Sequence, residues 1–187
     1  MRKLSIFLAM VLIGTTIQAQ STWKSDKAHS KVGFSITHLM ISEVEGSFGE
    51  FDITAMADDD FDNASFDVDI KVASIDTDNE NRDNHLKSPD FFDAEKYPSI
   101  TFKSTNFEKT GDNTFNLTGD LSMHGVTKSV TLEGKVNGVI TDQRSQKLKA
   151  GLKLTGTVNR LEFGVGGDTP TLGDDVEFTV NLEMAQQ

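Results

Sequence analysis

The sequence predicts an all-β protein in which about eight antiparallel strands close into a barrel. Apolar and polar residues alternate with a period of two in segment after segment, as in strands with one wet face. Clusters of Asp, Asn and Gly separate these segments and predict turns. Glycines inside the strands permit the coiling that closes a sheet. A barrel of this size holds one small ligand, and a sandwich of two sheets is the alternative.

The first four strands are expected at residues 32–38, 48–55, 66–72 and 100–107. The first places Phe34, Ile36 and His38 on one face, with Ser35 and Thr37 on the other. The third alternates Phe66, Val68 and Ile70 with charged neighbours. In an antiparallel sheet, the apolar face is expected to point inward.

The last four strands are expected at residues 115–123, 130–136, 148–155 and 176–183. Each again has apolar residues at every second position. The inward positions include Phe115, Leu117, Leu132, Leu152 and Phe178. No linker or internal repeat divides the chain, so these strands belong to one domain.

A helical crossover interrupts the strand pattern near residues 78–95. Asp78 or Asn79 can cap the start of a short helix, and Pro89 ends it. We expect this crossover to cover one end of the barrel. The side chains that would close the barrel are Leu86, Phe91 and Phe92.

The N-terminal residues 1–19 have the layout of a secretory signal peptide. Arg2 and Lys3 precede an apolar run that is too short for a stable membrane span, and Ala19 is a small residue at the expected cut. A retained N-terminal anchor is the alternative. Cleavage leaves a domain of residues 20–187 without a stable membrane anchor. The sequence contains no cysteine, and export without disulfides suits a bacterial periplasm as well as other compartments.

Composition limits the partners. The formal net charge of −11 argues against binding to nucleic acid or to anionic membrane surfaces. Thirteen Phe against one Tyr and one Trp favour an apolar interior, because Phe needs no polar partner when it is buried.

Arginine is scarce and lies beside acids at two places, Arg82 next to Asp83 and Arg160 near Glu162. A chain that otherwise uses lysine is expected to place arginine where planar, paired contacts matter. The partner could be a protein carboxylate or the head group of a ligand. For Arg82 we expect chiefly carboxylates, since several acids surround it.

No catalytic or metal-binding pattern is present. The four histidines lie far apart without zinc-ligand spacing, so no metal or other cofactor is expected. Asp83, His85 and Ser88 contain the letters of a catalytic triad, but three residues of one short helix rarely reach its geometry. An enzyme is therefore not expected.

Four ordered motifs resemble the YceI-like polyisoprenoid-binding family. They are "WKSDKAHSKVGFSITHLMISEVEGSFGEF" (23–51), "ASIDTDNENRDNHLKSPDFFDAEKYPSITFKS" (73–104), "GDLSMHGVTKSVTL" (119–132) and "NRLEFGV" (159–165). The resemblance covers nearly all of the chain after residue 22. It implies a lipocalin-like, eight-stranded barrel whose hydrophobic channel holds a long isoprenoid or a fatty amphiphile. It also implies export to the periplasm and a possible homodimer.

The function expected from these inferences is lipid binding for periplasmic storage or transport. The alternatives are a structural β-protein with a filled core, and a small hydrolase or isomerase. The residues expected to anchor a head group or the crossover are Arg82, Asp83, His85 and Arg160. The residues expected to bind the ligand are Phe34, Ile36, His38, Phe66, Val68, Ile70, Leu86, Phe91, Phe92, Phe102, Phe115, Leu117, Leu132, Leu152, Phe163 and Phe178.

Overall fold

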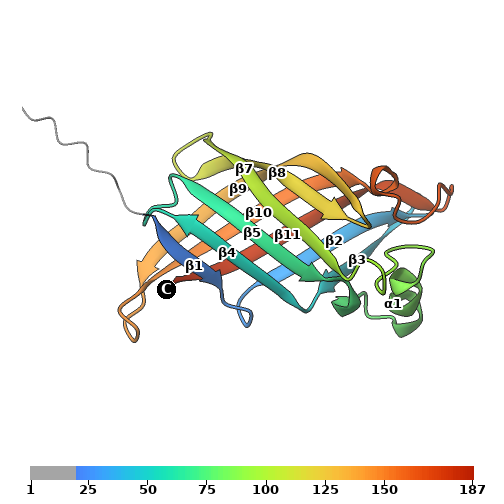
Figure 1. The fold of residues 1–187 in the computed structure, drawn as a ribbon, viewed down its shortest axis with the longest axis horizontal. Helices are drawn as coiled ribbons and strands as arrows, with labels where there is room; N and C mark the ends of the chain where they lie inside the picture. Colours follow the sequence, from blue (N-terminus) through green and yellow to red (C-terminus); the bar gives the residue numbers. More distant parts are fainter. Residues whose placement is uncertain (1–19) are drawn as a thin grey trace, which may run out of the picture.

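A computed structural model describes residues 20–187, and the predicted signal peptide lies outside this range. Eleven strands, one α-helix and two 3-10 turns make up the fold (Figure 1). The strands are β1 (Ser21–Ser25), β2 (Lys31–His38), β3 (Ser42–Phe48), β4 (Phe51–Ala57), β5 (Ala64–Lys71), β6 (Ile75–Asp76), β7 (Ser99–Lys109), β8 (Thr114–Met123), β9 (Val126–Thr141), β10 (Leu148–Asn159) and β11 (Leu172–Gln186). The helix is α1 (Glu80–Lys87), and the 3-10 turns are η1 (Val72–Ser74) and η2 (Arg160–Phe163).

The eleven strands occupy eight positions around a closed antiparallel barrel, as predicted. Three positions are each shared by two consecutive strands of a bent segment, β1 with β2, β3 with β4, and β5 with β6. The long strand β11 shows this sharing directly, because it pairs with β2 through Leu172–Asn181 and with β1 through Met184–Gln186. The pairing of β1 with β11 closes the ring, which excludes the open sandwich.

Two bends account for differences from the expectation: one interrupts the strand expected at residues 48–55, and the other separates the unexpected β1 from the expected strand at residues 32–38. The expected strand at residues 48–55 is two strands, since pairing stops at Gly49 and Glu50 between β3 and β4. The other bend, between β1 and β2, is fixed by β11. There the backbone N–H of Asp26 donates to the carbonyl of Glu183 at 2.8 Å, and the Ser30 hydroxyl accepts from the N–H of Glu183 at 3.1 Å.

The inner wall has aromatic rings lying over glycines of neighbouring strands. A Cβ added to Gly156 would lie only 2.6 Å from Cζ of Phe178, closer than real Cβ atoms approach a ring. The missing side chain lets the ring lie against the backbone. The cross-strand pairs of this kind are Phe34 with Gly46, Phe115 with Gly134, and Phe178 with Gly156.

One half of the barrel has a solid core. The ring of Trp23 is fully buried and packs edge-on against Phe61, with the ring centroids 4.7 Å apart. Phe115, Leu152 and Met184 are each at most 2% exposed in the same solid half. Residues at inward positions of the predicted alternation are buried here or line the hollow half, so the predicted inward face is confirmed.

The hollow half lies at the end of the barrel that carries α1 (Figure 1). The side chain of Asn79 caps the helix by accepting from the backbone N–H of Arg82 at 3.0 Å, and the helix ends at Lys87 before Pro89. Three apolar side chains of the crossover pack against the core, as predicted: Leu86, Phe91 and Phe92. Within residues 20–187, the structure has no helix long and apolar enough to cross a membrane.

Candidate functional site

The hollow half encloses a cavity of about 380 Å³. Its wall is formed by inward-facing side chains of the barrel strands and by the crossover around α1. Among residues 20–187, four of the lining residues carry polar side chains, and all four have nitrogen-bearing groups: His38, Arg82, His85 and Arg160. They come from the end of β2, from α1 and from η2. The cavity therefore has an apolar body and one polar, cationic end.

The structure brings together most of the residues predicted to bind a ligand. Thirteen of the sixteen line the cavity: Phe34, Ile36, His38, Phe66, Val68, Ile70, Leu86, Phe91, Phe92, Phe102, Leu117, Leu132 and Phe178. The other three, Phe115, Leu152 and Phe163, are buried but do not line it. Alternation identifies which residues point inward, but it does not tell where along the barrel the solid core ends.

Arg82 anchors the crossover, but not through the carboxylate that we expected. Its Nε donates to the hydroxyl of Thr77 at 2.7 Å, and its Nη2 donates to the carbonyl of Thr77 at 2.7 Å. The Thr77 hydroxyl in turn donates to Oδ1 of Asp83 at 2.6 Å, and the Thr77 N–H donates to the same oxygen at 2.9 Å. Thr77 and Asp83 are both buried, so this network fixes α1 to the strand segment before it.

The guanidinium of Arg82 consequently keeps its charge available. Among the described residues, no carboxylate oxygen lies within 4.0 Å of its nitrogens, and Nη1 has no hydrogen-bond partner. Arg82 also lines the cavity. A planar cation in an apolar enclosure is suited to a carboxylate, phosphate or carbonyl oxygen of a ligand.

Arg160 is used differently. Only 3% of it is exposed, and it holds the loop between η2 and β11. Nε donates to the carbonyl of Gly173 at 2.8 Å, and Nη1 donates to the carbonyls of Val165 at 3.0 Å and Gly167 at 2.9 Å. The neighbouring Glu162 accepts from Lys128 at 2.8 Å, and the carboxylate that pairs with Arg160 is that of Asp174, whose Oδ1 lies 3.5 Å from Nη2. Arg160 therefore shapes the rim of the cavity.

Asp83, His85 and Ser88 have the residue types of a catalytic triad but do not form one in the structure. The Ser88 hydroxyl donates to the backbone carbonyl of His85 at 2.7 Å, not to its ring. The carboxylate of Asp83 accepts a hydrogen bond from the hydroxyl of Thr77. His85 instead packs edge-on against Phe91, with ring centroids 4.9 Å apart, and its Nε2 lies 3.7 Å from a carboxylate oxygen of Asp90.

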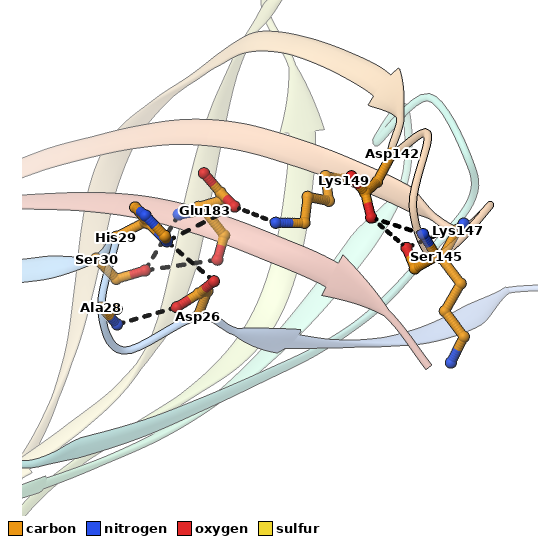
Figure 2. Close-up of polar contacts among 9 residues, drawn as sticks. All are labelled: Asp26, Ala28, His29, Ser30, Asp142, Ser145, Lys147, Lys149 and Glu183. Carbon is orange, nitrogen blue, oxygen red and sulfur yellow. Dashed lines mark hydrogen bonds and ion pairs between the residues drawn. The ribbon is translucent and has the colours of Figure 1, made fainter.

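A cluster of charged residues lies outside the barrel at the bend between β1 and β2 (Figure 2). Nδ1 of His29 is 3.0 Å from Oδ2 of Asp26 and 4.0 Å from Oε1 of Glu183. The hydrogen bond with Asp26 raises the pKa of His29 and lowers that of Asp26. These three groups lie close enough to converge on a cation, but Lys149 already pairs with the same Glu183 oxygen at 2.7 Å. The cluster fastens the bend to β11.

Several cavity residues were missed by the sequence reasoning. Val44, Phe48, Leu121 and Leu172 line the cavity. Val44 alternates with Glu43 and Glu45, which was a usable signal, although the small Gly46 weakens it. The role of Thr77 could not be predicted from the sequence, because its hydrogen bonds depend on how the following helix α1 lies against it.

The comparisons with known proteins agree with this architecture. The profile of the YceI-like domain matches residues 23–184. A UPF0312 protein of Pseudomonas putida is 35% identical over 185 residues, which span 98% of this chain and 95% of that protein. The crystal structure of a YCEI protein of Campylobacter jejuni is 38% identical, with a TM-score of 0.75 over 87% of this chain and 96% of that one.

A third similarity concerns the fold alone. The structure of a polyisoprenoid-binding domain from Saccharophagus degradans superposes with a TM-score of 0.67 over 88% of this chain and 98% of that one. The two sequences are 11% identical. The fold is thus shared beyond recognisable sequence similarity.

Proposed function

The chain belongs to the YceI-like family, and from this premise we propose that it binds a long-chain isoprenoid or another amphiphilic lipid in its barrel cavity. The observation that carries the proposal is the cavity with an apolar body and a cationic end. Its volume of about 380 Å³ falls within the range of small-molecule sites, roughly 300–1,000 Å³. A hollow interior does not suit the alternative of a filled structural core.

The apolar body accounts for affinity. Each buried CH₂ group contributes about 0.8 kcal/mol, so a long hydrocarbon tail needs few polar contacts. The wall offers aromatic rings from several strands and from the crossover, including Phe34, Phe66, Phe92, Phe102 and Phe178. A polar molecule would lose its hydration there without gaining partners.

The cationic end accounts for orientation. A head group placed between α1 and η2 would meet Arg82, whose charge is not neutralised by a neighbouring carboxylate among the described residues. His38 and His85 offer further ring nitrogens on the same rim. We therefore place the tail in the barrel and the head group beside the crossover.

We further propose that binding serves storage or transport in the periplasm, after export through the signal peptide at residues 1–19. What supports a binding role over catalysis is that the candidate catalytic groups near the cavity are engaged in holding the fold. Arg160 holds a loop, Asp83 holds Thr77, and Ser88 bonds a backbone carbonyl. The cavity is therefore better suited to recognising a ligand than to catalysing a reaction.

Native mass spectrometry of the purified protein tests the proposal. We expect a mass excess that disappears after extraction with organic solvent, and recovery of binding when fluorophore-labelled geranylgeraniol is added. Phe92→Ala should weaken this binding, because the ring lines the cavity and packs on Phe48. The matched control is Phe115→Ala, which lies outside the cavity and should lower stability by about 3–5 kcal/mol instead.

The head-group assignment has its own comparison. Arg82→Met should weaken the binding of geranylgeranyl phosphate more than that of geranylgeraniol, since only the phosphate engages the guanidinium. An equal loss for both ligands would show that Arg82 acts only by ordering the crossover. A protein that retains no amphiphile and binds neither compound would contradict the proposed function.

A further inference from the structure

The hairpin between β2 and β3 ends in three consecutive exposed apolar residues. The exposed fractions are 49% for Leu39, 79% for Met40 and 84% for Ile41. We call these three residues the apolar tip. Single exposed apolar residues need no explanation, but a run at the end of a hairpin is unusual for a soluble surface.

The backbone makes this choice of residues more unusual. The N–H of Ile41 donates to the carbonyl of His38 at 3.2 Å, which defines a tight turn with Leu39 and Met40 at its centre. Both central residues have positive φ, 52° and 58°. Such turns favour Asn and Gly, which tolerate this conformation and are also polar or small. The apolar side chains of the tip are therefore unfavourable in two ways: the turn conformation prefers other residue types, and the side chains are exposed to water.

The tip continues the wall of the cavity outward. His38, immediately before it, lines the cavity, and so do Val44 of β3 and Leu172 of β11. The N–H of Leu39 donates to the carbonyl of Thr171 at 2.8 Å, so the tip is fixed to the loop that Arg160 orders. β2 and β3 run to the end of the barrel that carries α1 (Figure 1). An apolar surface thus leads from the outside to the cationic rim.

We propose that the apolar tip inserts into the surface of a lipid bilayer and brings the cavity entrance to the membrane from which its ligand is taken. The inference rests on the proposed function, because a cavity for a membrane-borne chain needs a route that keeps that chain out of water. The contact is apolar rather than electrostatic. No acidic or basic side chain except His38 lies between residues 38 and 42, and the net charge of −11 opposes anionic lipids.

A triple variant tests the tip without threatening the fold. Leu39→Asn with Met40→Gly supplies the residues that this turn prefers, and Ile41→Thr keeps a β-branched side chain. The matched control is Ile140→Thr. Ile140 is 65% exposed on β9, near the hairpin at the opposite end of the barrel (Figure 1).

Flotation of unloaded protein with phosphatidylcholine vesicles measures the contact without any bound lipid. Wild type and Ile140→Thr should float with the vesicles, and the triple variant should bind at least about tenfold more weakly, since a single buried apolar side chain already contributes that factor. Added phosphatidylglycerol should not strengthen binding. Wild type that does not float, or a triple variant that floats equally well, would overturn the inference.

Transfer of fluorophore-labelled geranylgeraniol between vesicles then connects the contact to function. The rate with wild type should rise with vesicle concentration, while the triple variant should lose this dependence and keep its equilibrium binding in solution. If the triple variant instead changes the oligomeric state and transfers normally, the tip is an interface between protein copies and the inference fails. Failure to bind the labelled compound at all would contradict the proposed function, and flotation would still decide the role of the tip.

Discussion

Replacing Arg160 by alanine should destabilise the protein strongly, although the residue lies at the rim of the cavity. Arg160 is 3% exposed, its guanidinium donates three hydrogen bonds of 2.8–3.0 Å to the carbonyls of Gly173, Val165 and Gly167, and its Nη2 lies 3.5 Å from Oδ1 of Asp174. Hydrogen bonds from a charged donor contribute about 1.5–3 kcal/mol each. Gly167 is exposed, so water can replace one of these bonds. We expect a loss of about 3–5 kcal/mol in the free energy of unfolding.

Thermal and urea unfolding of the delipidated protein measure this loss. For a domain of this size, the expected decrease in melting temperature is roughly 6–20 °C. Arg160→Lys should recover only part of it, because an ammonium group cannot reach carbonyls on two sides of the loop with the geometry of the planar fork. The control is Arg144→Ala, which removes an exposed arginine in the turn between β9 and β10. If Arg160→Ala melts like Arg144→Ala but loses ligand binding, the arginine is a ligand contact and the reasoning is refuted.

Three further changes test other parts of the structure. Gly134→Ala places a Cβ against the ring of Phe115 and should cost about 1–3 kcal/mol in urea unfolding, whereas Gly151→Ala, whose Cβ would meet its nearest neighbour at 3.7 Å, should be tolerated. Thr77→Val removes the hydroxyl between Arg82 and Asp83. It should cost about 1–3 kcal/mol and speed hydrogen exchange in α1, and an unchanged exchange rate would contradict the network. His29→Asn should lower the urea midpoint at about pH 5.5 and have little effect at about pH 8.5. The hydrogen bond with Asp26 raises the pKa of His29 in the folded protein above its ordinary value of 6.5. The stabilisation is therefore fully present below pH 6.5 and is lost as the pH rises through the folded pKa. If wild type and variant differ in urea midpoint by the same amount at both pH values, the His29–Asp26 pair is not the cause of the difference.

The barrel could be predicted from the sequence because its pattern is local. Alternation over five or more residues, as from Phe66 to Val72, identifies a strand and its inner face without knowledge of its partner. The bends could not be predicted in this way. β3 has inner positions filled by Val44 and the small Gly46, so its apolar face is weak, and its pairing with β2 becomes clear only in three dimensions.

The candidate site was predictable in part for the same reason. Inward side chains were identified correctly, but the position of the solid core along the barrel depends on Trp23 and Phe61, which come from β1 and from the loop after β4. The contacts of Arg82 were mispredicted because nearby acids dominate its sequence neighbourhood. The residue that it bonds, Thr77, offers a hydroxyl and a carbonyl whose direction depends on the fold.

The seam of the barrel, where β1 pairs with β11 and closes the ring, has a consequence for the order of folding. The side chain of Gln186 donates to the Ser21 hydroxyl across 165 positions of the chain, and β11 also pairs with the distant β2, whereas the remaining neighbouring strands of the ring are much closer in sequence. Contacts between such distant segments form late and slowly, because a long loop must be closed first. A circular permutant that joins residue 187 to residue 20 through a short linker and opens the turn at residues 142–147 would convert this seam into a local hairpin. It should refold faster than the original order of strands while reaching the same barrel.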